Sequence, residues 1–225
     1  LRRQRQMCIR DRTDTHIILT LANGCTLQEP IRRHIRLDKG SPTERAQWQL
    51  VDDGHGVVWP ALLAPSAEGM LNVRDLLWDA VYERALATLQ AAGWQLDSLS
   101  PRDQELVALW RMEADINNGG FMQFLCNWGD PTCQLALGAL KKIGAERTHA
   151  ILADMRGLID RFEESPEVVQ LNDIYGAMTE DEQARLEELD EAYFEYPDNL
   201  ARLGLGYYGA VSYTHLRAHE TREDL

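Results

Sequence analysis

The stretch "NNGGFMQF", residues 117–124, places two asparagines and two glycines where a chain could wrap around a phosphate. A dinucleotide-type phosphate loop needs a strand before its glycines, whereas a helical pattern precedes these. A P-loop needs Lys and then Ser or Thr after its last glycine, and Phe-Met stands there instead. The nearest basic residues are Arg111 and Lys141. We therefore expect Gly119 or Gly120 to end a helix in the left-handed conformation, not to hold an anion.

Side chains for acid–base, metal and nucleophilic chemistry are present, but not at the spacing that such chemistry needs. Glu113 and Asp115 are two residues apart, so they lie on different faces of a helix and do not form an acid–base pair. His149 has no second histidine at zinc-site spacing, and the cysteines form no Cys-x-x-Cys pair. No serine stands in a nucleophile elbow. The sequence therefore predicts a protein without catalytic activity, metal or cofactor.

An unbalanced run of acids is the strongest chemical signal. Residues 160–198 contain fourteen Asp or Glu and two Arg, a net charge of −12. A solvated helix usually alternates Glu with Lys, because like charges at i,i+4 cost about 0.2–0.5 kcal/mol per pair. On a helical wheel, six acids instead share an arc of about 120°, opposite Leu186, Leu189 and Tyr193. These six are Glu180, Asp181, Glu187, Glu188, Glu191 and Glu195.

The helix that must position these acids is predicted over residues 180–195, and it opens with a capping box at Thr179 and Glu182. It holds eight acids over a length of about 24 Å, at a rise of roughly 1.5 Å per residue. That is one acid per roughly 3 Å of axis, compared with one phosphate per about 3.4 Å along a DNA strand. Taken alone, the charge favours an ordinary solvated face over a surface that imitates DNA.

Both ends of the chain are set aside. "LRRQRQMCIRDR", residues 1–12, and "VSYTHLRAHETREDL", residues 211–225, resemble translated sequencing-adapter sequence from metagenomic assemblies and are excluded from the fold. They contribute +4 and −1 to the total charge of −13, so residues 13–210 carry −16. No apolar run is long enough to cross a bilayer, and the scattered cysteines suit a reducing compartment, so we predict a cytoplasmic protein.

The remaining chain has two patterns. Residues 13–79 are β-rich, with one hairpin around an Asn-Gly turn and another that joins 48–51 to 57–59. "MLNVRDLLWD" then predicts one or two closing helical turns. Residues 80–210 predict about six helices and no strand. The fold class is therefore α+β, a small β-rich α/β module followed by a larger all-α helical bundle.

Capping signals divide this second part. Caps or first-turn prolines mark helix starts at Ser100, Asp130 and Ser165. A further helix is expected over 145–161. Aromatic residues after the glycine pair, Trp128 among them, are expected to pack one helix onto another.

Three strings in the second part, "NNGGFMQFLCNWGD", "ALGALKKIGAERTHAIL" and "LDEAYFEYPDNLARLGLGYY", resemble a family of small acidic bacterial proteins known as DNA mimics. The resemblance covers roughly residues 80–210. It implies a helical, dimeric protein with surface carboxylates in the place of DNA phosphates. Such proteins bind a DNA-binding protein, for example a transcription regulator. The positions that match the family motif, interpreted as fold-defining, are Asn118, Gly119, Gly120, Phe121 and Gln123.

The first part also resembles a known unit. "PTERAQWQLVDDGHGVVWPAL", followed by "LNVRDLLW", is similar to a small bacterial domain of unknown function that is often encoded beside toxin–antitoxin-like genes. The insertion "LAPSAEG", residues 63–69, departs from its compact pattern. The resemblance implies an α/β fold and no particular activity.

With the family resemblance, a partner-binding role becomes the favoured hypothesis. We expect a non-catalytic acidic protein that occupies the DNA-binding surface of a basic protein, without binding nucleic acid or membrane itself. The six acids of the wheel serve as phosphate surrogates, and a homodimer is one expectation. Two alternatives stay open: a toxin–antitoxin-type or immunity module that acts through residues 13–79, and an unrecognised hydrolase.

Overall fold

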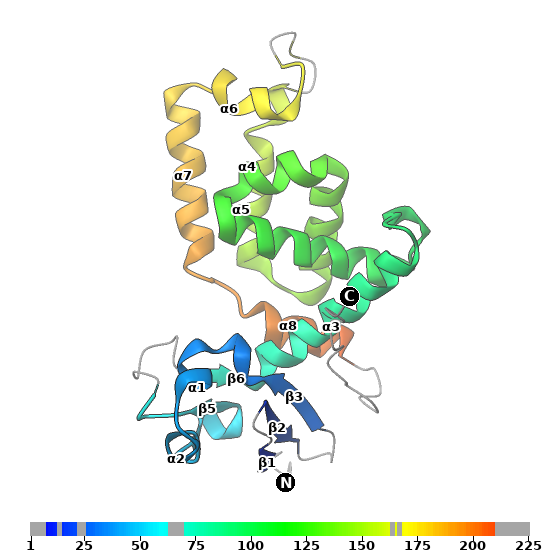
Figure 1. Ribbon diagram of the computed structural model, residues 1–225. Coiled ribbons are helices and arrows are strands. Elements are labelled where there is room, and N and C mark those ends of the chain that lie inside the picture. Colours follow the sequence, from blue (N-terminus) through cyan, green and yellow to red (C-terminus); the bar gives the residue numbers. More distant parts are fainter. Residues whose placement is uncertain are drawn as a thin grey trace, which may run out of the picture. The chain divides into compact units, whose positions relative to one another are not determined.

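Figure 1 shows the computed structural model of the chain. The residues that it describes are 8–12, 15–21, 26–62, 70–162, 165 and 168–209. The expected Asn23-Gly24 turn, the insertion 63–69 and the outermost segments 1–7 and 211–225 lie outside them.

The chain divides into two compact units between Ala80 and Val81, inside helix α3 (Val73–Ala91). The first unit holds all the strands of the described residues, and the second is helical. The α+β fold class expected from the sequence is confirmed.

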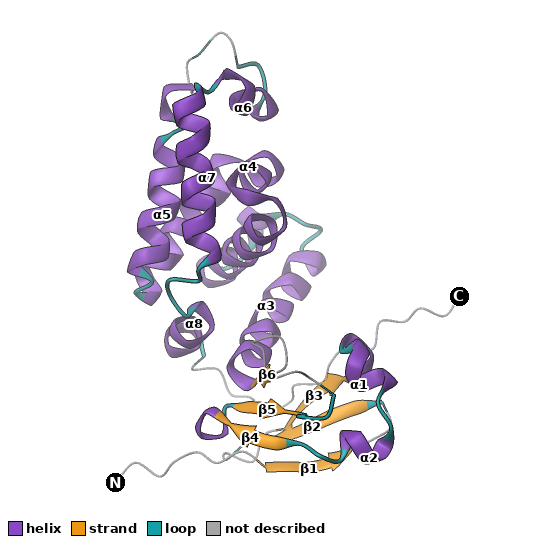
Figure 2. Cartoon of the chain, turned by 90° about the vertical axis from the view of Figure 1, so that its left-hand side faces the viewer, coloured by secondary structure: helices purple, strands orange, loops and turns teal. Residues whose placement is uncertain are grey.

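Two three-stranded antiparallel sheets make up most of the first unit (Figure 2). One sheet contains β1 (Cys8–Arg12), β2 (His16–Thr20) and β3 (Thr26–Pro30), and the other contains β4 (Gln49–Val51), β5 (Gly56–Val58) and β6 (Met70–Asn72). Both expected hairpins are confirmed, with Thr20 opposite Thr26 and Val51 opposite Gly56. The expectation that residues 1–12 contribute nothing to the fold is wrong for β1, because this strand pairs with β2.

Short helical segments connect these strands. They are η1 (Ile31–Arg33), α1 (Ile35–Lys39), α2 (Pro42–Arg45) and η2 (Asp52–Gly54). Ser41 caps α2, because its hydroxyl accepts a hydrogen bond from the backbone N–H of Glu44. Side chains from both sheets, such as Leu19 and Val57, form one buried core together with Trp59, which follows β5. Removal of this apolar surface from water is what stabilises the unit.

The closing segment of the first unit differs from the expected one or two helical turns. Its first three residues are strand β6, in which Leu71 is buried opposite Val57. Helix α3 then starts directly and runs for 19 residues. The Asn72 side chain accepts a hydrogen bond from the N–H of Arg74 (2.9 Å) and so satisfies a donor in the first turn. The helix stops before Gly93, whose φ of +65° suits glycine.

The second unit is built from helices of very different lengths. After η4 (Leu96–Ser98) come α4 (Pro101–Ile143), α5 (Glu146–Gly157), η5 (Asp160–Phe162), η6 (Leu171–Asp173), α6 (Ile174–Ala177), α7 (Glu180–Phe194) and α8 (Leu200–Tyr208). The helix expected over 145–161 is shorter than predicted, since α5 ends at Gly157. No helix begins at Ser165, and the next helical turn starts only at Leu171; Pro166 lies outside the described residues.

Helix α4 consists of helical pieces separated by glycines. The backbone leaves the helical region at Gly119 and Gly120 and again at Gly129. Gly120 has φ 78° and ψ −179°, so the expected left-handed stop is wrong in detail: the φ is positive, but the ψ is extended. The left-handed conformation occurs at the end of α4 instead, where Gly144 has φ 75° and ψ 28°.

Candidate functional site: the acidic face of helix α7

Helix α7 is positioned by a capping box at its start and by an apolar face along its length. The backbone N–H of Thr179 donates to the Glu182 carboxylate (2.8 Å), and the N–H of Glu182 donates to the Thr179 hydroxyl (3.3 Å). Leu186, Leu189 and Tyr193 are buried, as the wheel predicts. The helix contacts α4 and α5 (Figure 1).

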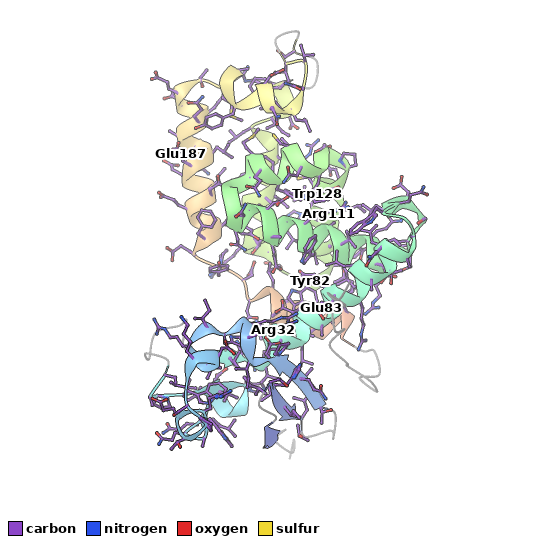
Figure 3. All side chains as sticks on the ribbon, viewed as in Figure 1. Arg32, Tyr82, Glu83, Arg111, Trp128 and Glu187 are labelled. Atoms are coloured by element: carbon purple, nitrogen blue, oxygen red, sulfur yellow. The ribbon has the colours of Figure 1, made fainter. Side chains whose placement is uncertain are left out.

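The opposite side of α7 carries the six acids that the sequence singled out. All six side chains are exposed: Glu180, Asp181, Glu187, Glu188, Glu191 and Glu195. We call these six residues the acidic face. Figure 3 shows Glu187 on the side of α7 that is turned away from α4 and α5.

Neutralising partners of the acidic face are few. Arg185 donates to Glu188 (2.9 Å) and also lies 3.6 Å from Asp154. The Tyr175 hydroxyl lies 3.4 Å from a Glu187 oxygen. Among the residues that the structure describes, no ion pair involves any other member of the acidic face. The face therefore presents nearly its full charge to solvent.

The second arginine of this region binds an acid outside the acidic face. Arg161 donates two hydrogen bonds to Glu182, at 2.7 and 2.6 Å, and its guanidinium lies 3.9 Å from the centre of the Phe162 ring. These bonds, together with the N–H of Thr179, lower the pKa of Glu182 to about 2.

The inner side of α7 carries one further acid, Asp190, which meets the glycine break of α4. Its carboxylate accepts a hydrogen bond from the backbone N–H of Phe121 (2.9 Å). A Cβ on Gly120 would lie 2.6 Å from an Asp190 oxygen, so a side chain there would displace the carboxylate. Burial raises the pKa of Asp190, and the Phe121 N–H opposes that rise. The glycine pair therefore does receive an anion, and that anion is the chain's own carboxylate.

The other motif residues also make contacts within the unit. A Cβ on Gly119 would collide with the Gln123 amide, which lies over that glycine. This amide accepts a hydrogen bond from Asn118 (3.1 Å) and donates one to Asp115 (3.0 Å). Phe121 is fully buried. Each motif position is thus engaged by its own helix or by α7.

Trp128 differs from the expected helix-packing residue. Its ring is 36% exposed, and the guanidinium of Arg111 lies 3.8 Å from the ring centre (Figure 3). The indole N–H donates to Asp115. Burial lowers the pKa of Arg111. Glu113 points elsewhere and accepts a hydrogen bond from the Tyr82 hydroxyl (2.8 Å), so Glu113 and Asp115 have separate partners.

Most other bases of the second unit with described partners are bound to acids away from the acidic face. Arg156 donates two hydrogen bonds to Asp130, at 2.7 and 3.2 Å. Lys142 pairs with the buried Glu105, which also accepts from the Tyr208 hydroxyl (2.8 Å). These bases are thus engaged elsewhere in the unit, and the acidic face is left mostly without ion pairs.

Within the ranges that the structure describes, no group of three or more His, Cys, Asp or Glu residues could hold a metal ion. Likewise, no described helix is both long and apolar enough to cross a membrane.

Sequence reasoning missed polar side chains that join distant parts of the second unit. Asp190 lies on the same helix as the acidic face but bonds to a backbone amide 69 residues earlier. Asn117 accepts a hydrogen bond from Tyr196, 79 residues later (3.1 Å). The only signal for Asp190 was its position at the edge of the apolar face of the wheel, next to Leu186 and Tyr193.

The fold and this surface define an acidic helical protein with a small β-rich unit at its start. The chain belongs to the DMP19-like protein family, a DNA-mimic family whose model matches residues 97–218. Residues 10–77 match the model of a second family, DUF2442, whose members are described as proteins of unknown function. Both resemblances stated from the sequence are confirmed, and neither family is a known enzyme family. No curated protein and no solved structure matches the chain.

Proposed function

We propose that the second unit is a non-catalytic DNA mimic whose acidic face occupies the DNA-binding surface of a basic protein, such as a transcription regulator. The observation that carries the proposal is the one-sided charge of α7. Six carboxylates point outward, and among the described residues only Glu188 of this face has an ion-pair partner. Membership of the DMP19-like family supports the same function.

The dimensions of the acidic face suit this role. From Glu180 to Glu195 the helix rises about 22 Å, a length that holds roughly six or seven phosphates of one DNA strand. Six carboxylates therefore offer a charge similar to that of the strand they replace. A groove lined with Lys and Arg would exchange its counterions for this face, so affinity should fall steeply as salt increases.

Capture from a bacterial lysate tests the proposal. The full chain is immobilised at low salt, and bound proteins are eluted either with salt or with added duplex DNA. We expect DNA-binding proteins in both eluates, because duplex DNA and the acidic face compete for one surface. Bound proteins that DNA does not displace would contradict the proposal.

Two matched variants locate the contact. Glu191→Gln with Glu195→Gln removes two charges from the acidic face, and Asp97→Asn with Asp103→Asn removes two charges near the α3–α4 connection. That connection lies well apart from α7 in both Figure 1 and Figure 2. We expect capture to weaken about tenfold or more for the first pair, since each charge-assisted contact contributes about 1.5–3 kcal/mol in favourable geometry, and to stay within about twofold for the second. Equal capture by both variants would direct attention to the first unit instead.

A further inference from the structure

Three exposed aromatic side chains border the acidic face. Tyr175 of α6 is 40% exposed, Phe194 at the end of α7 is 42% exposed, and Tyr196 just beyond α7 is 68% exposed. We call these three residues the aromatic border. Aromatic residues are enriched at protein–protein contacts relative to the rest of a protein surface.

One ring of the aromatic border contacts a carboxylate of the acidic face, and the other two are close to such carboxylates along the chain. The Tyr175 hydroxyl is 3.4 Å from Glu187. Phe194 is three residues after Glu191 and therefore shares its side of the helix. Tyr196 follows Glu195 directly. This part of the surface thus carries aromatic rings as well as carboxylates, and Tyr175 and Glu187 form one ring–carboxylate pair.

Two of these rings are held in place by the fold. The Phe194 ring meets the buried Tyr193 ring edge to face, at 6.4 Å and 82°. The Tyr196 hydroxyl donates to Asn117 (3.1 Å), which fixes the far end of that ring on α4. Held rings can accept a contact at little entropic cost.

The unit itself shows what a ring–carboxylate pair binds. Arg161 is held by both oxygens of Glu182 and lies 3.9 Å from the centre of the Phe162 ring. A guanidinium suits this combination, because it is planar, weakly hydrated and able to donate two parallel hydrogen bonds. A lysine ammonium is a compact and strongly hydrated charge, and it gains less from the ring.

We propose that the acidic face and the aromatic border together recognise arginine in preference to lysine, so the partner presents an arginine-rich DNA-binding surface. This inference rests on the proposed function and specifies the chemistry of the partner. Guanidinium groups stack on Tyr175, Phe194 and Tyr196 while they bond to the neighbouring carboxylates.

Two labelled peptides of equal length and charge test the preference in the full chain. One alternates Arg with Gly, the other Lys with Gly, and fluorescence anisotropy gives each dissociation constant at two salt concentrations. Each ring that stacks on a guanidinium should raise the affinity for the arginine peptide about two- to fivefold. We therefore expect the arginine peptide to bind about tenfold more tightly than the lysine peptide.

A triple variant, Tyr175→Leu with Phe194→Leu and Tyr196→Leu, should bring the two affinities within about twofold of each other. Its salt dependence should not change, because no charge is removed. Phe194→Leu alone removes no hydrogen-bonding group. Its affinity for the arginine peptide should fall about two- to fivefold, and this variant keeps the test valid even where the triple variant fails to fold.

The matched control is Trp94→Leu. Trp94 is 64% exposed and has φ +67°, comparable with the 68% and +49° of Tyr196. It belongs to the α3–α4 connection, which lies apart from α7. This control should keep the full arginine preference, whereas a loss equal to that of Phe194→Leu would overturn the inference.

The outcomes separate this inference from the proposed function. If both peptides bind equally, and both weaken when Glu191 and Glu195 are neutralised, the arginine preference is wrong and the acidic face still binds bases. If neither peptide binds the unchanged protein, both proposals fail. An arginine preference that persists in the triple variant and in Phe194→Leu also overturns the inference.

Discussion

Asp190 and Glu191 are neighbours on helix α7, yet they do opposite things. Asp190 points inward and holds the N–H of Phe121 at the glycine break. Glu191 points outward, between Glu187 and Glu195, at i,i+4 spacing from two charges of its own sign. The inner acid stabilises the fold, and the outer acids should destabilise it slightly. An acid that lowers stability and has no structural contact is most simply explained by a role in binding.

The largest expected effect is on the inner side, at Gly120. An alanine there must adopt a φ near +78°, and its Cβ would lie 2.6 Å from the Asp190 carboxylate. We expect Gly120→Ala to lower the free energy of unfolding by about 3 kcal/mol, as strained backbone and a lost hydrogen bond combine. Urea denaturation followed by circular dichroism measures it.

The matched control is Gly138→Ala, an exposed position inside the same helix where an added Cβ meets nothing within 4 Å. It should stabilise the protein by up to about 1 kcal/mol, because alanine is the better helix former. Equal effects at Gly120 and Gly138 would contradict the role given to the glycine break.

Removal of the inner carboxylate should have the next largest effect. Asp190→Ala leaves the Phe121 N–H without its partner, at a cost of about 2 kcal/mol. In the Gly120→Ala background the same substitution should cost much less, because the carboxylate has already been displaced and the two effects are coupled. Strictly additive free energies of unfolding would show that the two residues do not act on each other.

Acidification should separate the two acids of α7 with shifted pKa values, Asp190 and Glu182. The pKa of Asp190 is raised, so its contribution to stability increases as pH falls through that raised value. The pKa of Glu182 is lowered to about 2, so its contribution is complete above the ordinary value of 4.5 and is lost as pH falls towards 2.

Stability differences between the protein and its amide variants measure these trends. As pH falls from 7 to 4, the free energy of unfolding of the unchanged protein should rise relative to that of the Asp190→Asn variant. The difference in free energy of unfolding between the protein and Glu182→Gln should stay constant above pH 4.5 and shrink as pH falls below it. Parallel pH profiles for the two variants would mean that their environments are alike.

The smallest expected effect belongs to the outer side. Glu191→Gln removes two like-charge pairs, with Glu187 and Glu195, and should raise the free energy of unfolding by about 0.4–1 kcal/mol. The gain should vanish at high salt, where exposed charges are screened. A destabilised Glu191→Gln variant would show that this carboxylate has a structural partner.

Local signals predicted much of this architecture. The cap at Ser100 and the capping box at Thr179 depend on residues within a few positions, and each is present. The exposed stripe on α7 followed from helical periodicity alone. Strand β6 and the start of helix α3 were misjudged, because a short apolar segment such as "MLNV" fits strand and helix equally well.

Contacts between distant residues were beyond that reasoning. Nothing near Asp190 in the sequence reveals that its partner is Phe121, because the contact forms only when α7 packs on α4. Trp128 was expected to pack one helix onto another, but it pairs with Arg111 and Asp115 and stays partly exposed. Tertiary hydrogen bonds thus decided which polar residues are structural.

The most direct test of the account is the salt dependence of binding to a captured DNA-binding protein. Dissociation constants are measured between about 50 and 200 mM salt for the unchanged protein and for variants with Glu187, Glu191 and Glu195 replaced stepwise by Gln. The account predicts a steep slope that becomes shallower with each carboxylate removed, while the fold becomes no less stable. A slope that stays the same through all three substitutions would contradict it.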